Sequence, residues 1–441
     1  MRGGTAKIFL WTLLALAAVR LALMCTVPVF EPSEARYAAI SANMARSGDF
    51  VVPHFTHNLE YQSFDGKPPL VFQAGGLFCR LFGVCEFAVR LFPFLSAALL
   101  LLILFRTVRR FSDAETGRLA VLVCASCTAF YAAAGISMTD MTLTCCVAGA
   151  LLLYRCFLDG FGLASAAGVA ALLGAGMIVK GPVAMVMFGL PVLADAIVNR
   201  RWKGIFNARW LVVAPVFLAV AVPWFVLVER RNPGSVWYFF YNENFMRFIS
   251  HDYGDKYGAG REAFRGVSIL WALVATLPWS LLPLWEGVRT LVRRGKSGFR
   301  EILGRVDGRD FFLISVLAIT AFWCLTSRVL IYYLFPVVPL FAAWLALRVR
   351  GDRLRKLAWP CAGISLLVVC VALVGGTFFS DKMRGARTEF SVLENHYAHE
   401  FYHGRKTDAE LETCRKIRAE YLKRRAARKA AEAAAGKAGR E

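Results

Sequence analysis

The chain has 441 residues, of which 57% are hydrophobic and only 19% charged, with a mean hydropathy of +0.51. Soluble domains are about 45–50% apolar and about 25% charged, so this composition excludes a cytosolic enzyme, a secreted enzyme and a disordered protein. The net charge of +21 comes largely from clusters of lysine and arginine between apolar runs. That pattern is typical of the cytoplasmic loops of membrane proteins and not of a nucleic-acid-binding surface.

Apolar runs long enough to cross a bilayer follow one another along the chain. They predict about 11 spans, near residues 7–30, 88–105, 116–134, 141–158, 161–179, 182–198, 209–228, 266–288, 311–327, 329–347 and 357–379. The expected fold is therefore all-α, a polytopic transmembrane helix bundle that forms one domain over residues 1–379. Residues 380–441 are polar and basic, and we expect a tail that is helical from Asp408 onward.

The positions of the basic clusters predict the orientation of the bundle. If these clusters face the cytoplasm, the N-terminus is inside and the two longest polar inserts, 31–87 and 229–265, are both outside, where they can build a shared active site. The side of the tail stays open, because the odd number of spans places it outside whereas its positive charge favours the inside.

The first insert is expected to contain two helices that lie along the membrane surface. Ser33 is expected to cap a helix that runs to Gly48, with Tyr37, Ile40 and Met44 as an apolar stripe at helical spacing. Residues 69–84 predict a second helix, too short to span the bilayer comfortably. A disulfide between Cys79 and Cys85 stays open.

Charged side chains in the first insert are suited to chemistry on a phosphate. Lys67 and Arg36 can form a cationic cradle, although Lys67 is also explained as a membrane-edge anchor. Glu34 lies in the first turn of the expected surface helix, where it is either a catalytic carboxylate or a partner of the helix dipole.

Three further charged residues lie at the ends of spans. Asp140 is at an outer end, and a carboxylate against hydrocarbon is costly unless it is used or paired. Lys180 and Arg328 hold comparable positions, where contact with the lipid headgroups explains them almost as well as function.

Three motifs in the first insert carry a family resemblance. They are Glu31-Pro32-Ser33-Glu34-Ala35-Arg36-Tyr37, Ser47-Gly48-Asp49-Phe50-Val51-Val52-Pro53-His54 and Phe64-Asp65-Gly66-Lys67-Pro68-Pro69-Leu70. In this order they resemble the first external loop of the polyprenyl-phosphate-dependent GT-C glycosyltransferases, in particular the lipid A aminoarabinose transferase and protein O-mannosyltransferase group. The similarity continues through Thr139-Asp140, Val179-Lys180-Gly181-Pro182 and Trp237-Tyr238-Phe239-Phe240, and covers most of residues 10–350.

The resemblance implies an enzyme of the cell inner (cytoplasmic) membrane whose active site faces the periplasm. Such an enzyme moves a sugar from a polyprenyl (undecaprenyl) phosphate donor to an external lipid, glycan or protein, and a lipid A-type acceptor is one candidate. The residues that match are expected to act in catalysis (Glu34, Asp140, Lys67) and in donor-phosphate binding (Arg36, Lys67, Arg247, Arg328). Further candidates are Glu31, Ser33, Asp65, Lys180, Glu243 and Tyr333.

The chain departs from the family pattern at several of these positions. Ser33 stands where the family usually has Asp, so Glu34 or Glu31 would have to substitute for that carboxylate. Asp65 lies two residues before Lys67, whereas the family has Glu directly before its lysine. Of the Glu and His that hold a metal in some members, Glu243 alone is matched, so we predict no tightly bound metal, and a divalent ion is left as an unsupported alternative.

Two alternatives to the enzyme stay open. A transporter or flippase of a lipid-linked substrate would bind near the middle of the bilayer on broken helices, often in inverted repeats, but here the polar residues gather at the outer edge. A non-catalytic relative is the other alternative, kept open by Ser33. The sequence leaves the sugar and the acceptor unidentified.

Overall fold

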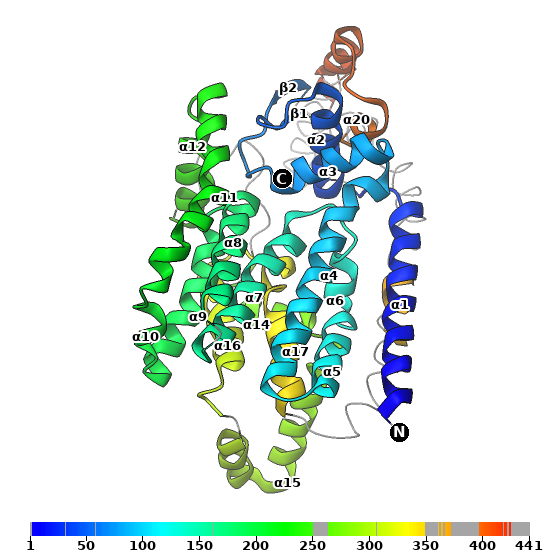
Figure 1. Ribbon diagram of the computed structural model, residues 1–441. Helices are drawn as coiled ribbons and strands as arrows, with labels where there is room; N and C mark the ends of the chain where they lie inside the picture. The colour runs from blue at the N-terminus through cyan, green and yellow to red at the C-terminus, as the bar shows by residue number, and fades with distance from the viewer. Residues whose placement is uncertain are drawn as a thin grey trace, which may run out of the picture.

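The computed structural model describes residues 2–249 except 31, 58 and 161, residues 263–348 except 306, residues 397–417, and the short stretches 360, 363–364, 367–371, 419–420 and 423–424. The described chain is almost entirely helical, which confirms the predicted all-α membrane bundle (Figure 1). The sequence analysis did not anticipate a small antiparallel hairpin in the first insert, in which β1 (His54–His57) pairs with β2 (Glu60–Ser63).

Five described helices are long and apolar enough to cross a membrane: α1 (Arg2–Thr26), α4 (Glu86–Phe111), α7 (Thr139–Leu158), α8 (Gly162–Lys180) and α11 (Arg209–Arg231). Shorter apolar helices occupy three more of the predicted spans: α9 (Val183–Asn199), α16 (Phe311–Cys324) and α17 (Val337–Arg348). The predicted span at 357–379 lies mostly outside the described residues.

Two predicted spans are each broken into a pair of helices. Residues 116–134 form α5 (Ala114–Ala125) and α6 (Thr128–Ala133), and residues 266–288 form α14 (Val267–Ala275) and the start of α15 (Leu281–Arg305). The two breaks bond to each other, because the Thr128 amide donates to the Leu277 carbonyl at 3.0 Å and the Trp279 indole donates to the Ser126 hydroxyl at 2.8 Å. Polar groups freed by one break are therefore satisfied by the other, as a membrane interior requires.

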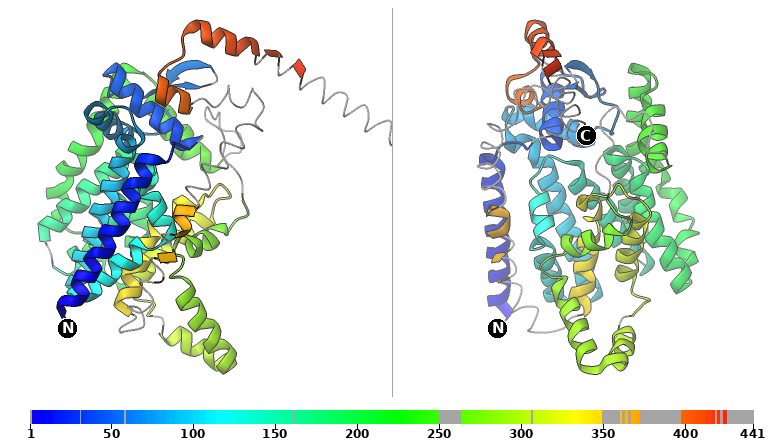
Figure 2. Two further views of the ribbon diagram at one scale, coloured as in Figure 1. Left: turned by 90° about the vertical axis from the view of Figure 1, so that its right-hand side faces the viewer. Right: turned by 180° about the vertical axis from the view of Figure 1, so that it is seen from behind.

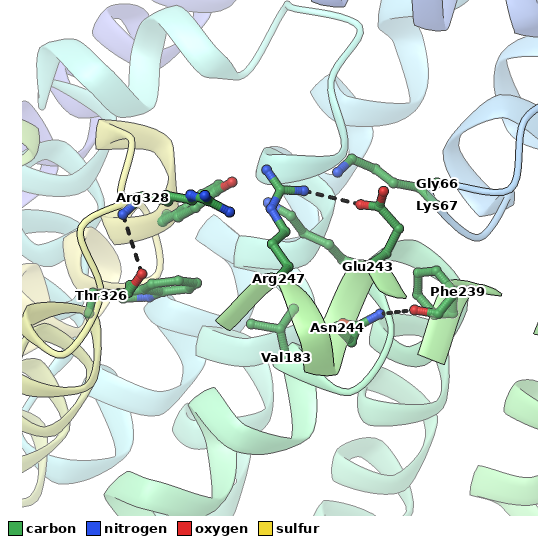
Figure 3. A pocket seen from close by; sticks show the side chains of 12 residues that line it. Gly66, Lys67, Val183, Phe239, Glu243, Asn244, Arg247, Thr326 and Arg328 are labelled. Carbon is green, nitrogen blue, oxygen red and sulfur yellow. Dashed lines mark hydrogen bonds and ion pairs between the residues drawn. The ribbon is translucent and has the colours of Figure 1, made fainter. Parts of the chain in front are cut away.

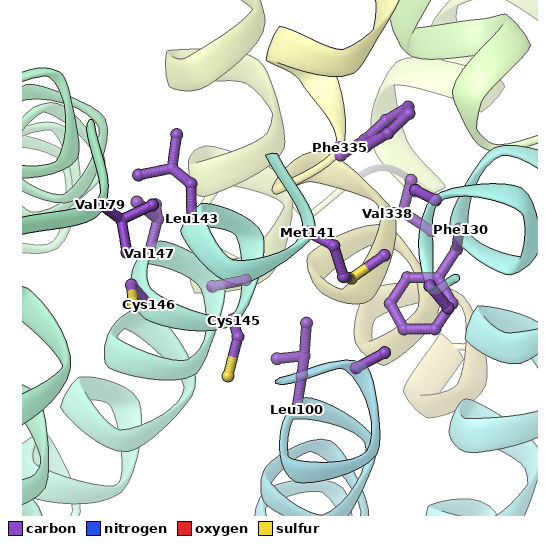
Figure 4. Packing of buried hydrophobic residues seen from close by; sticks show 14 of the residues in the cluster. Leu100, Phe130, Met141, Leu143, Cys145, Cys146, Val147, Val179, Phe335 and Val338 are labelled. Carbon is purple, nitrogen blue, oxygen red and sulfur yellow. The ribbon is translucent and has the colours of Figure 1, made fainter. Parts of the chain in front are cut away.

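Helix α7 lies at the centre of the bundle, and nearly all of its side chains are buried. Figure 4 shows apolar side chains of α7 packed with residues of α4, α8 and α17, and the cluster includes Leu100, Met141, Val147, Val179 and Val338. Cys145 and Cys146 belong to the same core, where they act as small apolar side chains. This packing fixes the N-terminal end of α7, which carries Asp140.

One end of the bundle is capped by α2 (Ser33–Ser47), α3 (Leu70–Phe82), the hairpin and the C-terminal helix α20 (Tyr397–His403), whereas α15 extends from the opposite end (Figures 1 and 2). The two expected surface helices are thus present with nearly the predicted bounds. The described cysteines Cys79 and Cys85 are both free, so the disulfide that the sequence left open is not formed.

Short helices connect these elements: α10 (Trp202–Ile205), α12 (Ser235–Trp237), the π-helix η1 (Tyr238–Met246), α13 (Arg247–Ile249) and the 3-10 helix η2 (Ile331–Leu334).

Candidate active site

Helix α2 ends where the sequence predicts, but it begins differently. Gly48 adopts a left-handed conformation with a φ of 78° and ends the helix, as expected for a C-terminal glycine. The predicted cap at Ser33 is wrong, because Ser33 is the first helical residue and Pro32 occupies the cap position without a side-chain bond. The Ala35 amide bonds to the Phe30 carbonyl instead, which leaves the Ser33 side chain to line a cavity.

Glu34 lies outside that cavity in a buried ion pair. The guanidinium of Arg90, from α4, contacts both Glu34 carboxylate oxygens, at 2.8 and 3.0 Å. The same carboxylate accepts from the amides of Phe30 and Ser137 at 2.9 and 3.0 Å. The Glu34 and Arg90 side chains are each 2% exposed. This geometry favours a structural role, in which Glu34 ties α2 to α4 and to the loop before α7.

A cavity of about 430 Å³ opens between the capping helices and the ends of α7 and α8. Its volume lies within the range of small-molecule binding sites. Four basic side chains line it together with two carboxylates: Arg36, Lys67, Lys180 and Arg247, with Asp140 and Glu243. The aromatic and polar residues of its wall include Ser33, Tyr37, His57, Phe64, Tyr332, Tyr333 and Tyr397.

A smaller hollow of about 60 Å³ shares Lys67, Lys180, Arg247, Glu243 and Tyr333 with the cavity, so the two adjoin along a common wall. Figure 3 shows Lys67, Arg247 and Arg328 directed into this hollow from different parts of the chain. The sequence analysis selected most of the charged residues that the fold brings together here.

Lys67 lies in the loop between the hairpin and α3, directly before the buried Pro68 and Pro69. These two prolines restrict the backbone at the point where the lysine enters the cavity. Burial, together with the positive charges of Lys180 and Arg247, lowers the pKa of Lys67 to about 8. A buried lysine that has lost its hydration and lies beside other positive charges is suited to bind an anion.

Asp140 and Lys180 form the second buried ion pair, and this pair faces the cavity. The Lys180 ammonium lies 2.5 Å from the Asp140 carboxylate and 4.5 Å from the centre of the Tyr333 ring. Lys180 is the last residue of α8, and Gly181 follows it with a φ of 77° at the turn into α9. The pairing that the sequence required of an intramembrane carboxylate is thus provided by Lys180.

Glu243 and Arg247 come from the second insert and form an ion pair of 3.1 Å one turn apart. Tyr238 also donates to Glu243, at 3.3 Å. Glu243 lies in the π-helix η1, an irregular geometry that is frequent at functional sites. Residues 250–262 of this insert lie outside the described residues, as does Glu31.

Arg36 lies among three aromatic rings. Its guanidinium carbon is 5.4, 5.6 and 6.0 Å from the ring centres of Tyr37, Phe64 and Tyr397, and its buried Nε has no hydrogen-bond partner. Among the described residues, no carboxylate forms an ion pair with Arg36. Its charge is therefore held by aromatic faces at the wall of the cavity.

Asp65, like Glu34, is a candidate residue that does not line the cavity. Its carboxylate accepts from Asn232 at 2.9 Å and from Ser235 at 3.0 Å, which ties the first insert to the second. These bonds give the Asp65 carboxylate a structural role in joining the two inserts.

Sequence reasoning missed three residues with clear structural roles. Arg90 was not among the candidates, although an arginine inside an apolar segment requires a buried partner, which here is Glu34. His57 and Tyr397 line the cavity and bond to each other at 2.9 Å. Tyr397 lies in the polar tail, and no signal in the sequence connects it with the first insert.

No group of three or more His, Cys, Asp or Glu side chains within the described ranges is arranged to hold a metal ion. The absence of a tightly bound metal stays a prediction.

These features define a class: a polytopic helical membrane protein with a cavity at one end that basic side chains from two inserts line. Residues 66–227 match the family model described as dolichyl-phosphate-mannose-protein mannosyltransferase. The resemblance to the GT-C glycosyltransferases, expected from the motifs, is thereby confirmed.

The more specific similarity is to aminoarabinose transferases. The undecaprenyl phosphate-alpha-4-amino-4-deoxy-L-arabinose arabinosyl transferases of Edwardsiella ictaluri and Serratia proteamaculans are each 30% identical to this chain, over 65% and 64% of its length. Those matches cover 49% and 52% of the two relatives, so the chain spans about half their length. The crystal structure of ArnT from Cupriavidus metallidurans bound to undecaprenyl phosphate matches with a TM-score of 0.65 at 25% identity, over 84% of this chain and 64% of that one.

Proposed function

We propose that this chain is an integral-membrane glycosyltransferase that moves a sugar from a polyprenyl-phosphate donor to an acceptor at the membrane surface. The observation that carries the proposal is the cavity in which Arg36, Lys67, Lys180 and Arg247 face two carboxylates, counted over the described residues. The similarity to transferases named for an undecaprenyl phosphate donor supports it.

When a glycosidic bond to phosphate breaks, negative charge develops on the phosphate oxygens. Lys67 and Arg247, which come from the two inserts and line both parts of the cavity, are placed to stabilise that charge. Tyr333 and Arg328 extend the same wall. We assign the donor phosphate to this shared part of the cavity.

Asp140 replaces Glu34 as the proposed carboxylate of the reaction, because it faces the cavity whereas Glu34 is enclosed by Arg90 and two amides. Its bond to Lys180 fixes its orientation in the cavity, where it can accept a hydrogen bond from a hydroxyl or ammonium group of a substrate. An acceptor that is itself an ionised phosphate would need no general base.

The finer parts of the proposal follow from the relatives. We propose aminoarabinose as the sugar, a lipid A-type phosphate as the acceptor, and the inner membrane with its periplasmic face as the location. The basic cluster lies at the capped end of the bundle and not at mid-depth, where transporters bind their substrates. No observation on the described residues favours the transporter.

The test is sugar transfer by purified protein, with undecaprenyl phosphate-aminoarabinose as donor and lipid A as acceptor. Replacement Lys67→Ala should remove about 2–4 kcal/mol of transition-state stabilisation and slow transfer roughly 30- to 1000-fold. Lys67→Arg should retain more activity because the charge survives. The exposed Arg289 in α15, at the opposite end of the bundle, provides the control: Arg289→Ala should leave the rate unchanged.

Transfer by Lys67→Ala at more than about a third of the wild-type rate, a loss below about 1 kcal/mol, would show that the lysine is only an anchor. The same assay after dialysis against EDTA should keep its rate, since basic side chains here take the position that a metal ion occupies in other phosphate sites. A loss that Mg²⁺ or Mn²⁺ restores would contradict this part of the proposal.

A further inference from the structure

The C-terminal helix α20 contributes to the wall of the cavity, although it lies more than three hundred residues beyond the first insert. Tyr397, its first residue, is 5% exposed and lines the cavity beside Ser33, Arg36 and His57. The Tyr397 hydroxyl and the His57 Nδ1 are 2.9 Å apart. Both rings pack on Phe55, with ring centres 5.8 and 5.5 Å from it.

Helix α20 is held in this position by a dense set of bonds. The buried Glu400 carboxylate accepts from Asn43 at 2.6 Å and from the Thr56 amide at 3.0 Å. Arg46 donates to the carbonyls of Glu400 and Phe401, at 2.9 and 2.7 Å. These contacts connect α20 to the C-terminal half of α2 and to β1, so Tyr397 is placed by the same elements that place Arg36 and His57.

Two spaces of different size lie on either side of the proposed phosphate site. Toward Arg328 and Trp323 there is a hollow of only about 60 Å³. Toward Ser33, His57 and Tyr397 the cavity reaches about 430 Å³ and is lined by hydroxyls, an imidazole and aromatic faces. A sugar joined to the phosphate must lie in the larger part, where polar groups can bond its hydroxyls and rings can cover its apolar face.

We propose that Tyr397 and His57 bind the sugar of the lipid-linked donor, so that α20 is a part of the substrate site and not a detached tail. The inference rests on the proposed function, because it takes the donor phosphate to lie at Lys67 and Arg247. It adds a carbohydrate-binding wall, formed by residues 57 and 397, that distinguishes the sugar-bearing donor from the bare lipid phosphate.

The experiment compares two probes on purified full-length protein: undecaprenyl phosphate, which lacks a sugar, and undecaprenyl phosphate-aminoarabinose, which carries one. Tyr397→Ala should weaken binding of the sugar-bearing lipid by about tenfold, the loss expected for one good contact, and leave binding of undecaprenyl phosphate unchanged. Lys67→Ala should weaken binding of both lipids. Tyr397→Phe, which keeps the ring, should show a smaller loss than Tyr397→Ala.

Tyr402 provides a matched control in the same helix. It is 40% exposed, bonds to Glu86 at 2.6 Å and does not line the cavity, so Tyr402→Ala should bind both lipids as the wild type does. Equal losses for both lipids in Tyr397→Ala, no loss for either, or the same selective loss in Tyr402→Ala would each overturn the inference. If the wild type binds neither lipid, the proposed function fails and the inference with it.

Discussion

Glu34 and Asp140 are two buried carboxylates that look alike in the sequence but have different surroundings in the structure. Glu34 and Asp140 each pair with one basic side chain, and each is almost fully buried. Glu34 is surrounded by protein donors on both oxygens, whereas Asp140 lines a cavity. A residue in a matching motif can therefore lie outside the cavity and join the elements that surround it.

The role of Glu34 can be tested through stability. Glu34→Gln leaves the Arg90 guanidinium buried without its counter-charge, and breaking such a pair costs about 3–5 kcal/mol. We expect a large drop in the unfolding midpoint of the detergent-solubilised protein, while the fraction that remains folded keeps its transfer rate. A variant that unfolds with the wild type but transfers no sugar would instead make Glu34 catalytic.

The low pKa of Lys67 predicts a pH dependence. Its ammonium is charged below a pKa of about 8 and neutral above it, so the charge that we propose binds the donor phosphate is lost as the pH rises. We expect kcat/KM for the donor to fall as the pH passes about 8, because this ratio reports the free enzyme. In Lys67→Arg the fall should vanish, since arginine stays charged across this range. A fall of the same size in both proteins would assign it to another group.

At the scale of elements, α2 connects nearly every part of the site. Its first turns carry Ser33 and Arg36 into the cavity, and its last turns bind α20 through Asn43 and Arg46. Its packing against α3 depends on the absence of a side chain at Gly76, where a Cβ would lie 2.9 Å from the Ser41 carbonyl oxygen.

Gly76→Ala should therefore separate α2 from α3 and destabilise the protein by about 1–3 kcal/mol, the usual cost of overpacking. Donor binding should weaken with it, since α2 carries Ser33, Arg36 and Tyr37 of the cavity wall. Thermal unfolding and donor affinity measure the two effects. Gly189→Ala, in α9 with open space around the site of the added methyl, should be neutral or slightly stabilising. Equal behaviour of the two variants would contradict this account of the packing.

At the scale of the whole molecule, the segments that build the cavity and the basic helix α15 lie at opposite ends of the bundle. The hairpin, α2, α3 and α20 lie at one end, and the basic helix α15 at the other (Figures 1 and 2). This arrangement agrees with the orientation expected from the basic clusters, and it places the described part of the tail, including the helical residues 408–417, at the end that carries the cavity.

Cysteine labelling with a membrane-impermeant maleimide tests this arrangement in cells. The exposed positions Glu60→Cys and Glu410→Cys should react from outside in intact cells, whereas Arg289→Cys should react only after the membrane is opened. The wild-type chain supplies the background from its native cysteines. Labelling of positions 60 and 410 from different sides would rule out a cavity that shares the first insert and the tail.

Much of the architecture could be predicted from the sequence, because lipid imposes strong and local constraints. Long apolar runs must be helical in a bilayer, and basic clusters record the orientation. The surface helices at 33–47 and 70–82 follow from apolar spacing, Gly48 and the two prolines before Leu70. The sequence also indicates the cationic residues of the cavity, because the motifs that contain them follow one another in the order that the family shows.

The tertiary structure alone decided which of these residues meet. Glu34 and Arg90 are 56 positions apart, and His57 and Tyr397 are 340 apart, so no local pattern couples either pair. The paired breaks at Ser126 and Leu277 likewise depend on each helix supplying the bonds that the other lacks. The local sequence determines which segments are helical and how deep they lie in the membrane, because each apolar segment avoids water on its own account. The partner of a buried polar group is decided only when distant segments pack together, because no water remains there to bond to that group.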